Sequence, residues 1–186
     1  MEPLILIDID GVCNAFGAPT HRIGRNLYAS NSHQRIDQAG KYTVVLDKRH
    51  PAWMGELEQY GEVMWATMWM HNAGPVFGEV AGFGQHWNYI DFAEHNDYAP
   101  RARTGNGVVN YKWAGILATV GETQPLVYVD DDMQPAHHEW AAMRNEAGIP
   151  TLFIQPDPAL GFTRSQYARV IEFLDALVPA TDTVAA

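Results

Sequence analysis

Two aspartates, Asp8 and Asp10, interrupt an apolar run near the start of the chain, from Leu4 to Val12. Such a run is typical of a strand buried in a parallel sheet, where a carboxylate is costly unless a cation or hydrogen bonds meet it. Alternate strand residues point to opposite faces, but Gly11 allows a sharp turn that brings both acids toward one crevice. We expect these acids to do chemistry around a metal ion; the alternative is an ordinary Asp-Gly turn after a strand.

More polar residues follow two other apolar segments. Thr67 follows one of them, and the acids Asp130, Asp131 and Asp132 follow another. In an open parallel sheet the ligand crevice lies at the carboxyl ends of the strands, so these groups are expected to converge with the first pair of acids. Facing carboxylates repel each other unless a hard divalent cation lies between them. Because these acids offer only oxygen atoms as ligands, the cation that they suit is Mg²⁺. Lys112, at the start of a predicted helix, and the Thr67 hydroxyl add donors for a phosphate.

Strands that alternate with helices predict parallel βαβ units, hence a three-layer α/β fold with a Rossmann-like parallel sheet. The predicted strands cover 4–8, 63–66, 126–129 and 151–154, with a further short strand at 87–92. Thr163 and Gln166 form a capping box before the last helix. The other predicted helices cover 51–60, 75–80, 111–120 and 135–147. We find no repeat or linker, so residues 1–179 are interpreted as one domain and 180–186 as a frayed tail.

Residues 12–50 are interpreted as an insertion after the first strand, a flap or small cap. Its strand at 42–46 is predicted to form a hairpin with 23–28. The whole chain carries a net charge of -10, which argues against a broad nucleic-acid-binding surface. Residues 20–50, however, contain six Lys or Arg and two Asp, a net charge of +4. This stretch either holds an anionic substrate or is a solvated loop, and the sequence leaves both readings open.

The chain has no apolar stretch of about 18 residues and no signal-peptide pattern, which predicts a cytoplasmic protein without a membrane partner. Cys13 is the single cysteine, in keeping with a reducing compartment, and is interpreted as a small buried hydrophobe rather than a nucleophile. The histidines show no transition-metal spacing, and Trp65, Trp69 and Trp113 are expected in the core, with base stacking by one of them as the alternative. Nothing in the sequence indicates an oligomeric state.

Four short motifs, in this order, resemble those of the haloacid dehalogenase superfamily of phosphohydrolases. They are the Asp-x-Asp-Gly-Val run that begins at Asp8, then Thr67, then Lys112, and then the pair Asp130-Asp131. A closer resemblance is to the small haloacid-dehalogenase-like domain of "Swiss army knife" RNA-repair proteins. It is carried by Asp-Gly-Val-Cys-Asn, the run 63–69, Lys112-Trp113, the triple Asp and the run 160–163.

The resemblance implies a two-step phosphoryl transfer. Asp8 would attack phosphorus and become an aspartyl phosphate. Asp10 would protonate the leaving oxygen and later deprotonate the hydrolytic water. Thr67 and Lys112 would bind the phosphoryl oxygens.

The resemblance also implies an Mg²⁺ cofactor, held by Asp8, the backbone carbonyl of Asp10, and the acidic pair. Within that pair we expect Asp131 to ligate directly and Asp130 to act as an outer partner or hydrogen-bond acceptor. The expected function is a magnesium-dependent phosphatase, with a nucleotide or nucleic-acid terminal phosphate as its substrate. A small-metabolite phosphatase and a non-catalytic phosphate- or metal-binding module are the alternatives.

Overall fold

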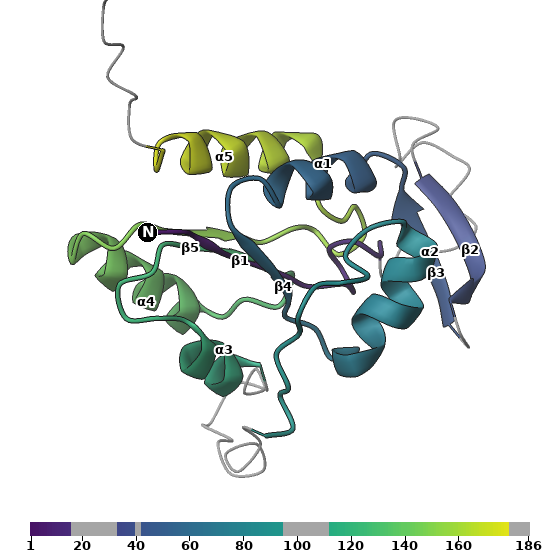
Figure 1. Cartoon of the computed structure of the whole chain (residues 1–186), viewed down its shortest axis with the longest axis horizontal. Helices are drawn as coiled ribbons and strands as arrows, with labels where there is room; N and C mark the ends of the chain where they lie inside the picture. Colours follow the sequence, from purple (N-terminus) through teal and green to yellow (C-terminus); the bar gives the residue numbers. More distant parts are fainter. Residues whose placement is uncertain (16–32, 40–41, 95–111, 179–186) are drawn as a thin grey trace, which may run out of the picture.

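A four-stranded parallel sheet forms the centre of the computed structural model, which describes residues 1–15, 33–39, 42–94 and 112–178 (Figure 1). The strand order is β4-β1-β5-β6, so β1 and β5 lie in the middle. The bounds are Leu4–Ile7 for β1, Glu62–Trp65 for β4, Leu126–Val129 for β5 and Thr151–Ile154 for β6. The predicted α/β class and parallel sheet are therefore confirmed, and the arrangement is compatible with a Rossmann-like fold.

The two middle strands are apolar because both of their faces are covered. Every residue of β1 and β5 is buried. Their side chains alternate: Ile5 and Ile7 belong to the core cluster on one face of the sheet, whereas Leu4 and Leu6 belong to the cluster on the other. Helices on both faces are what such continuous apolar strands require.

Helices pack on each face of the sheet and complete three layers (Figure 1). On one face, Met54 and Leu57 of α1 and Val170 of α5 join the cluster that contains Ile5 and Ile7. On the other face lie the helices α3 and α4. The bounds are His50–Leu57 for α1, Trp113–Thr119 for α3, Pro135–Glu146 for α4 and Arg164–Asp175 for α5. None of the helices in the described ranges is long and apolar enough to cross a membrane.

The segment after β4 is helical in three short pieces, which include the predicted helix at 75–80. The pieces are η2 Met70–Asn72, η3 Ala73–Gly78 and α2 Glu79–Ala81. The short strand predicted at 87–92 is wrong. Its contact with the sheet is an isolated bridge, in which Trp65 N–H donates to Asn88 O and Ile90 N–H donates to Trp65 O. Two backbone bonds around one residue do not extend into a ladder, although the aromatic composition favoured a strand.

An antiparallel hairpin of β2 His33–Ala39 and β3 Tyr42–Asp47 follows β1 in the chain. The strand predicted at 42–46 is confirmed, but its predicted partner is wrong: β3 pairs with His33–Ala39, and 23–28 lies outside the described residues. Only residues 40 and 41 separate the two strands, so β2 is the nearest segment that can pair with β3. β2 was not predicted because its sequence is mostly polar and lacks the apolar pattern that indicates a strand.

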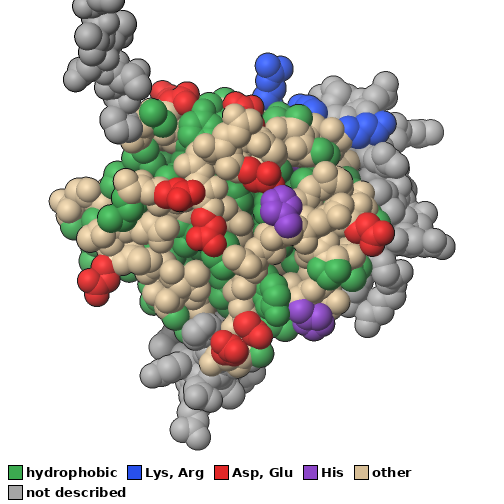
Figure 2. All heavy atoms as spheres, in the orientation of Figure 1, with side chains coloured by type: hydrophobic (Ala, Val, Ile, Leu, Met, Phe, Trp, Pro, Cys, Tyr) green, Lys and Arg blue, Asp and Glu red, His purple; other side chains and the backbone are tan. Residues whose placement is uncertain are grey.

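Of the basic stretch at 20–50, the structure describes 33–39 and 42–50. In the view of Figure 2, Lys and Arg side chains gather toward the end of the molecule where β3 and α1 lie, whereas Asp and Glu are spread over the face. Lys48 is exposed. Arg49 is engaged with its own neighbours, because its Nε donates to Asp47 Oδ1 at 2.9 Å and its guanidinium lies 4.9 Å from the Trp53 ring centroid. Arg49 therefore has a structural role, and the side chains of Arg22, Arg25, Arg35 and Lys41 lie outside the description.

The capping box predicted for the last helix is confirmed at α5. Thr163 N–H donates to Gln166 Oε1 at 2.9 Å, and the Thr163 side chain accepts from Gln166 N. We expect Thr163→Ala to lower the free energy of unfolding by about 1 kcal/mol, because the first turn of α5 loses an acceptor. Urea denaturation measures this loss. Thr163→Ser keeps the hydroxyl and serves as the control; a Ser variant as unstable as the Ala variant would contradict the capping role.

Candidate active site

The strand register brings the predicted polar groups to one edge of the sheet. Ile7 pairs with Trp65 of β4 on one side and with Val129 of β5 on the other, so the three strands end level. The backbone bonds continue one residue further, since Asp8 N–H donates to Val129 O at 3.0 Å and Ala66 N–H donates to Ile7 O at 2.9 Å. Asp8 and the residues that follow β4 and β5 therefore share the carboxyl edge.

A buried lysine joins two of these acids. Lys112 Nζ lies 2.5 Å from Asp8 Oδ2 and 2.6 Å from Asp130 Oδ2. The exposed fractions are 4% for Asp8, 9% for Lys112 and 0% for Asp130. Buried charges at these distances interact strongly because little water screens them. We call these three side chains the buried triad; with both acids ionised it carries one net negative charge.

Burial and the charges within the triad together set the pKa values of Asp8 and Lys112. Burial raises the pKa of Asp8 to about 7, against the lowering effect of Lys112. Burial alone would lower the pKa of Lys112, but the charges of Asp8 and Asp130 raise it above its ordinary value, so the ammonium stays protonated. One ammonium cannot fully compensate two buried carboxylates, and the raised pKa of Asp8 is a consequence of this excess of negative charge and of burial.

Asp130 is held by three donors. Its Oδ2 accepts from Lys112 Nζ and also from the Tyr128 hydroxyl at 2.5 Å, and its Oδ1 accepts from Asp132 N–H at 2.8 Å. These bonds fix the carboxylate that orients Lys112. Tyr128 was missed by the sequence analysis, which read it as one more apolar residue of the strand. Its pKa is raised well above the ordinary value by burial, so it acts as a donor to Asp130.

Asp131 packs directly against Gly11. A Cβ atom built on Gly11 would lie 2.2 Å from Asp131 Cγ, and Gly11 has a φ of +74°. Glycine therefore serves two purposes at this position: it allows the turn that the sequence predicts, and it makes room for the Asp131 carboxylate. Burial raises the pKa of Asp131 to about 6, with the charge of Asp130 as the next cause.

The acids at this edge fit the chemistry of a hard cation. One carboxylate oxygen from each of Asp8, Asp130 and Asp131 lies within 4.8 Å of the other two. Carboxylate oxygen atoms are the ligands that Mg²⁺ prefers in proteins. The three residues of this group are all aspartates, so its donors are all oxygen atoms. The side-chain carboxylate of Asp10 is not part of the group.

The Asp10 carboxylate is instead held by two neutral donors. Asn14 Nδ2 donates to Asp10 Oδ1 at 2.7 Å, and Trp69 Nε1 donates to Asp10 Oδ2 at 3.0 Å. Trp69 thus combines the expected packing against the core with a polar contact that the sequence analysis did not predict. Asn14 was not among the predicted site residues. The one sequence signal for it is its position four residues after Asp10, within a turn that must fold back on itself.

Thr67 lies in a tight turn after β4. It is 1% exposed, and its Oγ1 accepts a long hydrogen bond of 3.5 Å from Trp69 N–H. A hydroxyl that accepts a bond still has a proton to donate. Met70 closes the turn, since its N–H donates a hydrogen bond to Thr67 O at 3.1 Å. The φ of Met70 is +44°, a left-handed conformation that is rare outside glycine.

Several remaining expectations are confirmed. Cys13 is 1% exposed, and burial raises the pKa of its thiol, as expected of a small core residue rather than a nucleophile. Trp65 is fully buried, and Trp113 packs on His137 with ring centroids 4.3 Å apart. His137 also serves α4 as a cap, since its Nδ1 accepts from Gln134 N–H at 3.0 Å. Of the histidines in the sequence, His95 lies outside the described residues.

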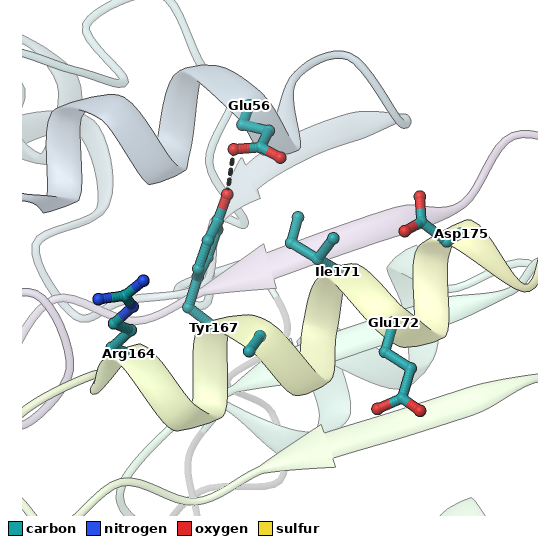
Figure 3. Close-up of a pocket in the computed structure, with 7 residues that line it drawn as sticks. Glu56, Arg164, Tyr167, Ile171, Glu172 and Asp175 are labelled. Atoms are coloured by element: carbon teal, nitrogen blue, oxygen red, sulfur yellow. Dashed lines mark hydrogen bonds between the residues drawn. The ribbon is translucent and has the colours of Figure 1, made fainter.

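A shallow cavity lies elsewhere, between α1 and α5. Its volume is about 450 Å³, and Tyr167, which bonds to Glu56, stands in it beside Ile171 (Figure 3). The lining shares no residue with the carboxyl edge. Because the buried triad lies at the edge and none of it lines this cavity, we place the candidate active site at the edge.

In comparisons with known proteins, no family model and no curated protein matches the chain.

The contact between Gly11 and Asp131 can be tested with a matched pair of variants. Gly11→Ala adds a methyl group that must displace the Asp131 carboxylate, so we expect Mg²⁺ affinity to fall at least about tenfold. Gly148 has a φ of +78° with nothing within 4 Å of the added Cβ, so Gly148→Ala brings the same backbone strain without the collision. Calorimetric titration measures both affinities. Equal Mg²⁺ affinity in the two variants would show that Asp131 does not contribute to a metal site.

Mg²⁺ binding should also release protons. Because the pKa of Asp8 is raised to about 7 and that of Asp131 to about 6, both carboxyls hold protons in much of the population near pH 6. A cation bound by carboxylates displaces these protons, whereas near pH 8 they have already left. Affinity is therefore expected to rise from pH 6 to pH 8. Titrations in two buffers of different ionisation enthalpy count the protons; affinity independent of pH would contradict the assignment of these ligands.

Proposed function

We propose that this protein is a magnesium-dependent phosphohydrolase that works through an aspartyl phosphate on Asp8. The observation that supports it most is the buried triad of Asp8, Lys112 and Asp130 at the carboxyl edge, with Asp131 beside it. Buried charges of this kind are costly for folding and are typical of functional sites. The resemblance of the motifs to the haloacid dehalogenase superfamily adds the roles of the individual residues.

In the first step, a carboxylate oxygen of Asp8 attacks the phosphorus atom of a phosphomonoester. The bond from phosphorus to the leaving oxygen breaks, and its electron pair goes to that oxygen. The oxygen takes a proton from the Asp10 carboxyl and departs as an alcohol. Asp8 is now an aspartyl phosphate, and Asp10 is a carboxylate.

In the second step, water replaces Asp8 on phosphorus. The Asp10 carboxylate removes a proton from the water as the water oxygen attacks. The bond between phosphorus and the Asp8 oxygen breaks, and its electron pair returns to the carboxylate. Inorganic phosphate leaves, and both aspartates regain their starting protonation states, so a phosphate ester and water become an alcohol and phosphate.

The other residues of the edge stabilise charge. Lys112, already 2.5 Å from Asp8 Oδ2, is placed to contact the phosphoryl oxygens as well, and the Thr67 hydroxyl donates to another of them. Asp130 keeps Lys112 in place. Asp8, Asp131 and the Asp10 carbonyl would hold Mg²⁺, with Asp130 as an outer partner. When bound, this ion neutralises negative charge between the acids and the phosphoryl group.

The substrate class we propose is a terminal phosphate on a nucleotide or nucleic acid. The support is the local charge, because residues 20–50 carry a net charge of +4 within a chain of net charge -10. Such a segment attracts a polyanionic substrate, but it adds nothing to the binding of an ester with a small neutral leaving group. A screen across nucleotides, sugar phosphates and oligonucleotides phosphorylated at either end separates this class from a small-metabolite phosphatase.

Asp8→Asn is the decisive variant for the reaction. It keeps the shape of the side chain but removes the nucleophile, so we expect turnover of 4-nitrophenyl phosphate with Mg²⁺ to fall by at least about a thousandfold. EDTA should abolish the activity of the unaltered protein. Asp175→Asn serves as the control. Asp175 is the last residue of α5, away from the edge, and its Oδ1 accepts a hydrogen bond from the Tyr60 hydroxyl at 2.7 Å.

Three results would count against the proposal. Turnover that survives in Asp8→Asn contradicts covalent catalysis, and turnover that survives chelation contradicts the role of Mg²⁺. Binding of Mg²⁺ and phosphate without any turnover by the unaltered protein would instead indicate a non-catalytic binding module.

A further inference from the structure

Both oxygens of the Asp10 carboxylate are held, and the two donors come from different parts of the fold. Asn14, in the turn after β1, donates to Oδ1 at 2.7 Å, and Trp69, just before η2, donates to Oδ2 at 3.0 Å. A carboxylate has about four acceptor positions, so these two bonds leave one on each oxygen for an exchangeable proton. The bonds fix the plane of the carboxylate and therefore the direction in which such a proton can be passed.

The amide of Asn14 links this carboxylate to the hairpin. Asn14 is 5% exposed, and its Oδ1 accepts from Val45 N–H of β3 at 2.8 Å. Rotating the amide by 180° would place its NH₂ against the Val45 N–H and its oxygen against the Asp10 carboxylate, both repulsive. The backbone of Asn14 is fixed as well, since its N–H donates to Ile9 O at 2.7 Å and its carbonyl accepts from Gly11 N–H at 2.8 Å. Only one orientation of the side chain satisfies all of these groups.

We propose that Asn14 is a positioning residue for proton transfer by Asp10, and that through Asn14 the β2–β3 hairpin sets the orientation of the Asp10 carboxylate. This inference rests on the proposed function, because it concerns the proton that the reaction moves. The nucleophile is held separately: Asp8 accepts from Ile9 N–H at 2.7 Å and from Lys112. A change at Asn14 therefore disturbs the proton donor and leaves the nucleophile in place.

A comparison of two leaving groups shows whether a variant has lost proton donation by Asp10 or nucleophilic attack by Asp8. Nitrophenolate departs without being protonated, whereas the alkoxide of an alkyl phosphate needs a proton as the bond breaks. The ratio kcat/KM covers the steps up to release of this alcohol. A misplaced Asp10 carboxyl should therefore slow an alkyl phosphate far more than 4-nitrophenyl phosphate.

Asn14→Asp is the sharpest test. It keeps the size of the side chain and an acceptor for Val45 N–H, but it replaces the donor to Asp10 by an oxygen that repels it. We expect kcat/KM for glycerol phosphate to fall at least about tenfold more than kcat/KM for 4-nitrophenyl phosphate, with the KM of the latter nearly unchanged. If circular dichroism shows that this variant is unfolded, Asn14→Ser, which cannot reach Asp10, replaces it with the same expected pattern.

Asn145 provides a matched control. Its amide also makes two bonds, with Nδ2 donating to Thr151 O at 2.8 Å and Oδ1 accepting from Thr151 N–H at 2.9 Å, but it links α4 to β6. Asn145→Asp makes the same chemical change there, and we expect the ratio between the two substrates to stay as in the unaltered protein.

A second readout does not depend on turnover. The indole N–H signal of Trp69, identified by its loss in Trp69→Phe, should shift in the nuclear magnetic resonance spectrum of Asn14→Asp, because the carboxylate that it contacts has moved. An equal fall for both substrates, or no fall with an unmoved indole signal, would overturn the positioning role. If the unaltered protein hydrolyses neither ester, the proposed function itself fails, and this inference fails with it.

Discussion

The site depends on one ammonium group shared by two buried carboxylates. Moving an ion out of water costs several kcal/mol even after relaxation, so Asp8 and Asp130 could not both lie at exposures of 4% and 0% without compensation. At about 4 Å and an effective dielectric constant of about 20, two unit charges attract by roughly 4 kcal/mol. Lys112 makes such an attraction with each acid, but the burial of the ammonium itself and the repulsion between the two carboxylates reduce the gain. With both acids ionised, two negative charges face one positive charge. The triad therefore keeps an excess of negative charge, and this excess suits the site to a cation and to the phosphoryl chemistry we propose.

Neutral hydrogen bonds fix the orientation of the carboxylates, which the charges alone do not. Coulomb attraction falls slowly with distance and has little direction, so on its own it would leave the carboxylates free to turn. The Tyr128 hydroxyl and the Asp132 N–H fix Asp130, and Asn14 and Trp69 fix Asp10. Asp10 is thus held from two separate parts of the fold, whereas the neutral donors to Asp130 lie within two residues of it along the chain.

The sequence predicts what local patterns encode. The bounds of β5 and β6 agree with the prediction, as does the capping box at Thr163, because apolar runs and cap residues act over a few positions. The convergence of Asp8, Thr67 and the 130–132 acids on one edge follows from parallel topology. The contacts themselves could not be predicted: Trp69 and Asp10 are 59 residues apart, and no spacing rule connects an indole to that carboxylate. Tyr128 and Asn14 lie only two and four residues from the acids that they contact, but neither an apolar strand pattern nor a turn indicates a bond to a carboxylate. The hairpin partner was not predicted because its residues are polar.

The bond between Lys112 and Asp8 spans 104 residues, and this distance along the chain has a consequence during synthesis. The ribosome makes β1 first, and for more than a hundred residues Asp8 has neither its ammonium partner nor the neighbouring strand β5. Contacts of such long range also form late in folding, because a large loop must close before they are gained. A nascent chain therefore carries the acid without the charge that holds it in place. The nucleophilic role that we propose for Asp8 therefore requires the completed sheet, and a nascent chain would lack it.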